Sequence, residues 1–158
     1  MRVLLSALIL LVLAGCNKDD LSYLSICNET PIPIYATSYT SDYSDGEWIA
    51  PGISDEFYSL NINHLDGFRY FSLYYDSLIV FLKDHEEHPV KFYSDGKTIN
   101  YDPELNPFIN PEVWQTRTFY RHVPGTSFES MEEKQIFEDY FSIEISSIIS
   151  LPDLQKEN

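Results

Sequence analysis

The chain has 158 residues, and its 10 Lys and Arg against 25 Asp and Glu give a formal net charge of −15 at pH 7. This length fits one domain. So acidic a chain is excluded from the nucleic-acid-binding class, which relies on a basic surface, and its charge disfavours adsorption to anionic lipid. Aromatic residues form 15% of the chain, which favours β-strands.

The N-terminus carries the pattern of an export signal. Arg2 precedes the run Val3–Leu13, in which every residue except Ser6 is apolar. This run is too short to span a bilayer as a helix, which needs about 20 residues, but it has the length of a signal-peptide core. We therefore expect residues 1–15 to be removed as a signal peptide.

The apolar run ends in Leu13-Ala14-Gly15-Cys16, which resembles the bacterial lipobox. The resemblance implies cleavage between Gly15 and Cys16 and attachment of lipid to the Cys16 thiol. A single acyl chain anchors a protein only marginally, whereas two or more anchor it stably. We therefore expect a domain that folds outside the bilayer and is held at the membrane through Cys16.

Residues 16–20 form a short acidic tether behind this anchor. Lys18, Asp19 and Asp20 resemble the export signal that Bacteroides-type bacteria use to place lipoproteins on the outer leaflet of the outer membrane. The resemblance implies display on the cell exterior. A plain solvated linker on a periplasm-facing protein is the alternative, since charged segments of this kind also stay disordered.

Cys27 is the only thiol left once Cys16 carries lipid. No intramolecular disulfide can then form, and the alternatives are intermolecular pairing or a reactive thiol. Because Cys27 follows the apolar stretch 21–26, we expect a strand there with Cys27 as a small buried hydrophobic residue.

Residues 32–40 alternate in the manner of a strand. Even-numbered positions are mostly apolar, and odd-numbered positions carry Tyr35, Thr37 and Tyr39. Pro31 and Pro33 lack the N–H that a strand ladder needs, so this strand is expected to begin at a sheet edge.

The middle of the chain contains five further segments. We expect a polar loop at 41–46, a turn at Pro51-Gly52 and a strand at 56–60, while Phe68–Tyr75 fits either a strand or a short helix. Ser77–Lys83 contains five consecutive apolar residues, a pattern that suits a strand buried on both faces.

The C-terminal part reads as a hairpin and two longer strands. Val90–Tyr93 and Thr98–Tyr101 flank Asp95-Gly96, a hairpin turn signal, and Trp114–His122 alternates as a strand. Ser130-x-x-Glu133 permits a helix start, yet the alternation over 137–145 favours a long strand.

These elements predict a mainly β fold, either an antiparallel β-sandwich or a partly open barrel of about 7–9 strands, with room for one short helix. The expected organisation is a signal peptide at 1–15, a tether at 16–20, a single β-rich domain at 21–150 and a C-terminal tail at 151–158.

Four segments, taken with the signal, resemble a loose family of small uncharacterised surface lipoproteins of Bacteroides-type bacteria. The segments are Ile32–Tyr39, Trp48–Gly52, Asp76–Asp84 and Tyr140–Ile143. That family has no assigned activity and no catalytic motif, so the resemblance implies a location and a type of protein only. Asp76-Ser77-Leu78 also resembles the O-glycosylation acceptor motif of these bacteria, which makes Ser77 a candidate for modification; an unmodified strand start is the alternative.

Exposed aromatic side chains are the best candidates for ligand contacts. Tyr35, Tyr39, Trp48 and Trp114 are suited to stacking on sugar rings or on a peptide, and cross-strand packing is the alternative.

The candidate metal-binding segments of the sequence do not match known metal-site motifs. His85-x-x-His88 lacks the His-Glu-x-x-His spacing of zinc proteases, and Ser41–Glu47 lacks the calcium-loop pattern. With 25 acidic residues, the sequence singles out no catalytic pair. We therefore expect no catalytic residue, no metal and no cofactor.

The expected function is a non-enzymatic, lipid-anchored binding or structural module on the outer-membrane surface, with a glycan or a protein as partner and no nucleic acid. A subunit of a surface adhesin or nutrient-uptake assembly is the alternative, and a small hydrolase is a remote third. An exposed aromatic stripe on one sheet would favour binding, whereas a closed cleft with paired acids would favour hydrolysis.

Overall fold

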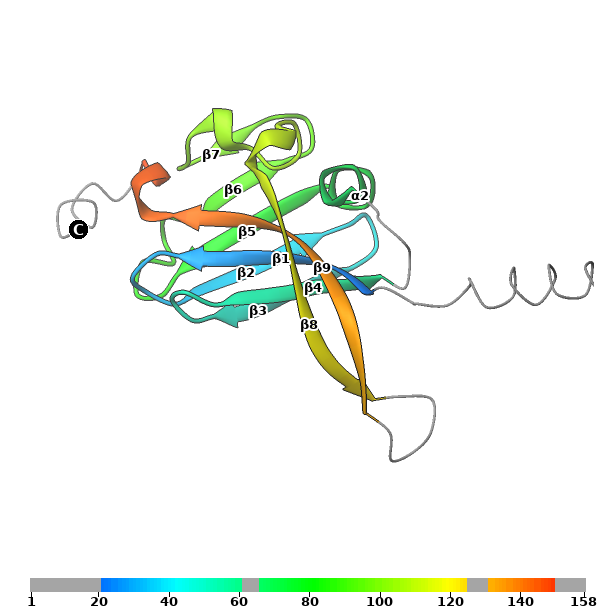
Figure 1. Cartoon of the computed structure of the whole chain (residues 1–158). Helices are drawn as coiled ribbons and strands as arrows, with labels where there is room; N and C mark the ends of the chain where they lie inside the picture. The colour runs from blue at the N-terminus through cyan, green and yellow to red at the C-terminus, as the bar shows by residue number, and fades with distance from the viewer. Residues whose placement is uncertain (1–20, 61–65, 125–130, 150–158) are drawn as a thin grey trace, which may run out of the picture.

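The computed structural model describes residues 21–60, 66–124 and 131–149 (Figure 1). The expected signal peptide, the Gly15/Cys16 cleavage site, the tether residues Lys18, Asp19 and Asp20, and the C-terminal tail lie outside the described residues. Within the described ranges, no helix has the length and apolarity needed to cross a bilayer.

Sheet A contains the first strand of the described chain and its last two. Its order is β4-β1-β9-β8, with β1 (Leu21–Glu29), β4 (Ser54–Leu60), β8 (Trp114–Pro124) and β9 (Met131–Glu144). The pairs β4–β1 and β9–β8 are antiparallel, whereas β1 and β9 run parallel. The first and last strands of the fold are therefore neighbours.

Sheet B is antiparallel throughout and has the order β3-β2-β5-β6-β7. Its strands are β2 (Ile34–Tyr39), β3 (Ser44–Ile49), β5 (Ser77–Leu82), β6 (Val90–Tyr93) and β7 (Thr98–Ile99). The sheets pack face to face and do not close into a barrel, so the predicted mainly β sandwich is confirmed.

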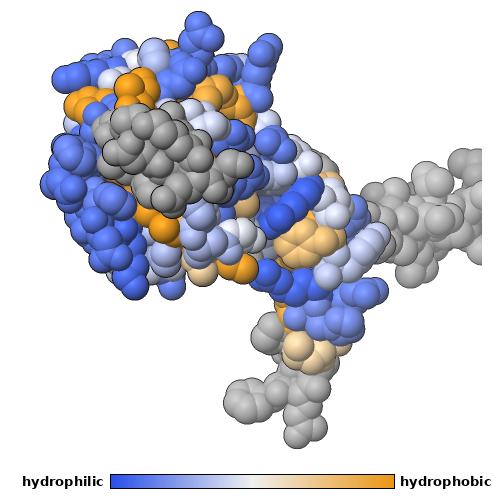
Figure 2. Space-filling view, turned by 90° about the vertical axis from the view of Figure 1, so that its left-hand side faces the viewer, coloured by the Kyte–Doolittle hydropathy of each residue, from blue (hydrophilic) through white to orange (hydrophobic). Residues whose placement is uncertain are grey.

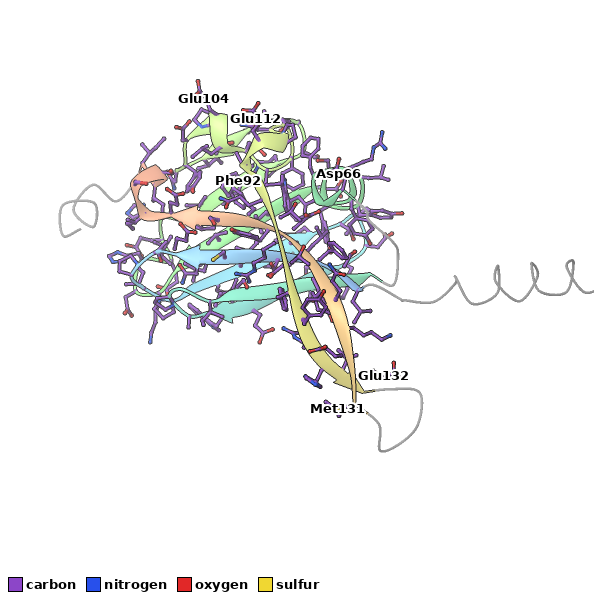
Figure 3. All side chains as sticks on the ribbon, in the orientation of Figure 1. Asp66, Phe92, Glu104, Glu112, Met131 and Glu132 are labelled. Carbon is purple, nitrogen blue, oxygen red and sulfur yellow. The ribbon has the colours of Figure 1, made fainter. Side chains whose placement is uncertain are left out.

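One hydrophobic core lies between the sheets. Phe92 of β6 is at its centre (Figure 3) and packs edge-on against Tyr101 at 5.1 Å and Phe141 of β9 at 5.5 Å between ring centroids. Edge-to-face contacts of this kind stabilise aromatic pairs beyond their buried area. Around them pack the inward aliphatic side chains of both sheets: Ile26, Ile34, Ala36, Ile49, Leu78, Val80, Leu82, Val90 and Ile143.

The ambiguous aromatic segment forms a helix, α2 (Gly67–Tyr74). The Asp66 carboxylate caps its first turn by accepting a hydrogen bond from the Arg69 N–H, and Phe71 packs on Phe108 and Trp114. A Cβ at Gly67 would lie 2.5 Å from Cβ of Asp139, so only glycine fits this close approach. The helix closes one end of the sandwich (Figure 1).

The expectation that 77–83 is buried on both faces is wrong. In β5, Leu78, Val80 and Leu82 are completely buried, whereas Ile79 and Phe81 are half-buried. A two-layer sandwich covers each sheet on one side only, so the second face of β5 has no layer above it.

The expectation that the strand after Pro31 and Pro33 begins at a sheet edge is also wrong. β2 lies inside sheet B between β3 and β5. Both prolines precede Ile34, the first residue of the ladder, so their missing N–H groups remove no ladder bond. The expected polar loop 41–46 is shorter than predicted, because β3 begins at Ser44.

The long-strand prediction for the C-terminal segment is confirmed, and the helical alternative is wrong. β9 begins at Met131 and its pairing with β1 begins only at Ile136. Residues 120–124 of β8 and 131–135 of β9 therefore pair with each other alone. They form an arm that projects from the body, with Met131 and Glu132 at its distal end (Figures 1 and 3).

The alternation in burial gives a matched pair of stability tests. We expect Leu78→Ala to lower the free energy of unfolding by about 2–5 kcal/mol, because it leaves a cavity in the core. Leu73→Ala, on the exposed face of α2 where the side chain is 73% exposed, is expected to change it by less than about 0.5 kcal/mol. Urea denaturation of the unlipidated C16S chain measures both, and equal losses would contradict the assigned core.

Candidate functional site

The outer face of sheet B carries a row of three aromatic side chains. Trp48 of β3 and Phe81 of β5 both pair in register with Tyr35 of β2. The Tyr35 ring centroid lies 5.5 Å from that of Trp48 and 6.4 Å from that of Phe81. Trp48 is 51% exposed, and Tyr35 and Phe81 are half-buried. We call these three residues the aromatic row.

Gly46 helps to fix the position of the Tyr35 ring. A Cβ at Gly46 would lie 2.8 Å from the Tyr35 hydroxyl oxygen and 2.7 Å from the Thr37 Cβ. The tyrosine side chain therefore lies across the neighbouring strand in space that any other residue at position 46 would occupy. The aromatic row is thus set by close packing and not only by strand pairing.

Tyr39 and Ser77 lie on the same face, farther along the strands. They pair with each other, and Ser77 also pairs with Tyr93 of β6. Ser77, the candidate for O-glycosylation, is half-buried, between an exposed Asp76 and a fully buried Leu78. Three of the four aromatic candidates, Tyr35, Tyr39 and Trp48, therefore share one face.

Trp114 is separate from them. It lies in sheet A and faces the core, with its ring 5.2 Å from Phe71 and 6.3 Å from Phe141. Its indole N–H donates to the Pro107 carbonyl at 2.9 Å. Trp114 closes the end of the core beside α2 and does not join the aromatic row.

The outer face of sheet A contains a buried carboxylate that the sequence did not reveal. Glu138 of β9 is 2% exposed and accepts hydrogen bonds from the Ser25 hydroxyl and the Arg117 guanidinium. Arg117 also donates to the Ser54 hydroxyl at 2.6 Å. Burial raises the pKa of Glu138, but the bonds from Arg117 and Ser25 outweigh it and hold that pKa below its usual range. The carboxylate is therefore kept charged by the fold.

Aromatic rings surround this ion pair. The Arg117 guanidinium carbon lies 5.1 Å from the centre of the Tyr140 ring and 5.9 Å from that of Phe119. Arg121 lies 5.6 Å from the Tyr23 ring. Cation–π contacts at such distances stabilise partly desolvated cations. This cluster helps to cover Glu138 on an outer face where Tyr23, Ser25 and Ile136 are also at most 8% exposed.

Cys27 also lies on this outer face, between Ser54 and Ser142 in register. It is half-buried, so the expectation of a buried core residue is wrong. Partial burial, followed by the charge of Glu29, raises the pKa of the thiol. A raised pKa keeps the thiol protonated and lowers its nucleophilicity at neutral pH.

A cavity of about 310 Å³ lies where β9 ends, beside the short 3-10 helix Pro111–Val113. Glu112 (Figure 3), Glu144, Gln115, Ser142 and Tyr101 are among its lining residues. Small-molecule sites are usually larger than about 300 Å³ and mainly apolar. This cavity is at the lower limit of that range and polar, so the aromatic row is the better binding candidate.

Metal ligands do not gather in the part of the chain that the structure describes, where no group of three or more His, Cys, Asp or Glu side chains is suitably placed. His85 and His88 lie in the turn after β5, and the His88 imidazole is 3.9 Å from Glu87. In the segment Ser41–Glu47, which was compared with a calcium loop, the Asp45 carboxylate accepts a hydrogen bond from the Gly46 N–H at 2.9 Å.

No protein-family model, curated protein or solved structure matches this chain.

The depressed pKa of Glu138 makes a pH-dependent contribution to stability. This contribution is complete above the ordinary glutamate pKa of the unfolded chain and is lost as pH falls through the lower folded-state pKa. We expect Glu138→Gln to lower the free energy of unfolding by about 1.5–3 kcal/mol at pH 7, with a difference from wild type that shrinks below about pH 4. Urea denaturation across pH 3–7 measures this.

The control is Glu132→Gln at the exposed end of the arm, for which we expect no change. A loss for Glu138→Gln that is independent of pH would contradict a role for the Glu138 charge.

Proposed function

We propose that this protein is a lipid-anchored, non-enzymatic carbohydrate-binding module displayed on the outer-membrane surface. The observation that carries the proposal is the aromatic row, three side chains aligned across adjacent strands on a face without a second layer. Aromatic residues in a row on an open sheet offer flat apolar surfaces to the C–H faces of sugar rings.

The dimensions of the row suit an extended chain. Adjacent strands lie about 4.8 Å apart, so a row across three strands is about 10 Å long. The hydroxyls of Ser44 and Ser77 share this face and add hydrogen-bonding groups. An open platform of this kind supports binding of a polymer better than binding of an enclosed small molecule.

The anchor supports a position close to the membrane. Cys16 lies five residues before Leu21, where β1 begins. An extended chain covers at most about 3.6 Å per residue, so the lipid attachment lies within about 18 Å of the fold. With Lys18, Asp19 and Asp20 as the export signal, the module would sit on the outer surface.

A second candidate function is that of a subunit in a surface adhesin or nutrient-uptake assembly. The edge strand β8 favours this function, because it has 11 residues and lies at the edge of sheet A, with its last part in the arm. A long edge strand is a template for pairing with an extended segment of another protein.

The carbohydrate proposal is tested by Trp48→Ala. Removing the most exposed ring of the row is expected to weaken binding of a polysaccharide by about 10- to 100-fold, equivalent to about 1.5–3 kcal/mol of lost apolar burial. Affinity electrophoresis of the C16S chain in gels containing single polysaccharides measures this. Tyr120→Ala, an exposed aromatic on the arm, is the control and is expected to bind as wild type. Equal binding by Trp48→Ala and wild type would sink the assignment of the site.

The anchor is tested by Cys16→Ser. We expect this change to abolish incorporation of labelled fatty acid and to move the protein from the membrane fraction to the soluble fraction. Cys27→Ser is the matched control and is expected to keep both. Retention of the Cys16→Ser protein in the membrane fraction would contradict a lipid anchor at this residue.

A further inference from the structure

The outer face of sheet B differs in charge from the rest of the chain. Acidic residues outnumber basic ones by 25 to 10 overall. Strand register assigns eleven outward positions on β2, β3, β5 and β6, and none of them is acidic. They are Tyr35, Thr37, Tyr39, Ser44, Gly46, Trp48, Ser77, Ile79, Phe81, Lys91 and Tyr93. The single charged residue among them is a lysine.

Lys91 lies one row away from the aromatic row. It pairs with Ile79 of β5 and with Ile99 of β7, and it is half-buried. The aliphatic part of a lysine packs on such neighbours while the ammonium group reaches the surface. Lys91 therefore places a positive charge on this face, in the row next to the aromatic row.

Two further lysines extend the basic side of this face. The Lys97 ammonium lies 5.8 Å from the centre of the Tyr93 ring. Lys83 follows Phe81 by two positions, and its N–H donates to the Pro33 carbonyl, which continues the β5 ladder. The nearest acidic residues along the strands are Asp45 and Glu47, which are exposed and alternate with Gly46 and Trp48 on the edge strand β3; by register they share the side of Ser38 and Ala36, opposite to the aromatic row. Asp76 and Asp95 lie in the turns at the strand ends.

Screening by salt limits how far the acidic residues elsewhere on the protein act on a ligand at this face. At physiological ionic strength the Debye length is about 8 Å, so exposed acids on distant surfaces repel a bound anion only weakly. The lysines on the face itself are within reach of a ligand lying on the aromatic row. A neutral glycan could not form ion pairs with these lysines.

Building on the proposed function, we propose that the glycan bound at the aromatic row is anionic, a polysaccharide with carboxylate or sulfate groups on its sugar rings. The rings stack on Trp48, Tyr35 and Phe81, and the acidic groups pair with Lys91 and its neighbouring lysines. Charge complementarity and aromatic stacking then act on the same polymer.

The test compares matched charged and neutral polymers. The C16S chain is run in affinity gels that contain polygalacturonate, alginate, hyaluronan or dextran sulfate, and in gels with the neutral counterparts, methyl-esterified polygalacturonate and dextran. We expect retardation by at least one acidic polymer, at least about 10-fold weaker binding to neutral polymers, and loss of affinity as salt rises from 50 to 500 mM. Binding to dextran sulfate alone would assign the anion as sulfate, and binding to the uronic-acid polymers would assign it as carboxylate.

Lys91→Gln is the diagnostic variant. It is expected to weaken binding of the acidic polymer about 5- to 10-fold and to remove part of the salt dependence, with an unchanged urea midpoint. Lys134→Gln on the arm is the matched control and is expected to bind as wild type.

The failures are distinguishable. Equal binding of charged and neutral polymers, unaffected by Lys91→Gln, would overturn the anionic ligand and leave the carbohydrate-binding proposal standing. Binding of acidic polymers that survives both Trp48→Ala and Lys91→Gln would overturn this face as the site. Retardation by none of these polymers, charged or neutral, would count against both proposals.

Discussion

The position of the aromatic row depends on one constraint: only one face of sheet B packs against the other sheet. Ile34, Ile49 and Leu82 point into the shared core and are at most 2% exposed, so the residues next to them in each strand must point outward. Tyr35, Trp48 and Phe81 therefore emerge side by side. A slip of one residue in either pairing would reverse the faces of a strand, so core packing fixes the register that builds the aromatic row.

The same constraint explains what the sequence could predict. The strand over 34–39 has one mostly apolar face and one tyrosine-rich face. As the alternation predicts, the apolar face lies against the core and the tyrosine-rich face points outward. The continuous run at 78–82 does not alternate, so periodicity could not distinguish burial on both faces from burial on one. The missing information is which layers exist around the strand, and this depends on segments far away in the chain. The candidate site was likewise predicted only in part. The sequence pattern proposed Tyr35, Tyr39 and Trp48. Only the strand pairing showed that Phe81 belongs with them and that Trp114 faces the core.

Glu138 illustrates an interaction that local pattern cannot reveal. The alternation in β9 puts it on a polar face, yet its partners Arg117 and Ser25 are 21 and 113 residues away in sequence. They meet because β9 pairs with β8 on one side and, in parallel, with β1 on the other.

Figure 2 shows one side of the molecule as mostly hydrophilic, with small separate hydrophobic groups and the arm standing out below the body. The two outer faces thus differ in character: sheet A carries a buried ion pair beside aromatic rings, and sheet B carries the aromatic row with lysines nearby.

The most direct measurement is the fluorescence of Trp48 during titration with a polysaccharide that the protein binds. The chain has two tryptophans, so Trp114→Phe leaves Trp48 as the single indole reporter on the aromatic row. If a sugar ring stacks on Trp48, its emission shifts to shorter wavelength and its quenching by acrylamide falls, both saturating with the binding curve. Binding that leaves the emission and the quenching of Trp48 unchanged would contradict the aromatic row as the binding site.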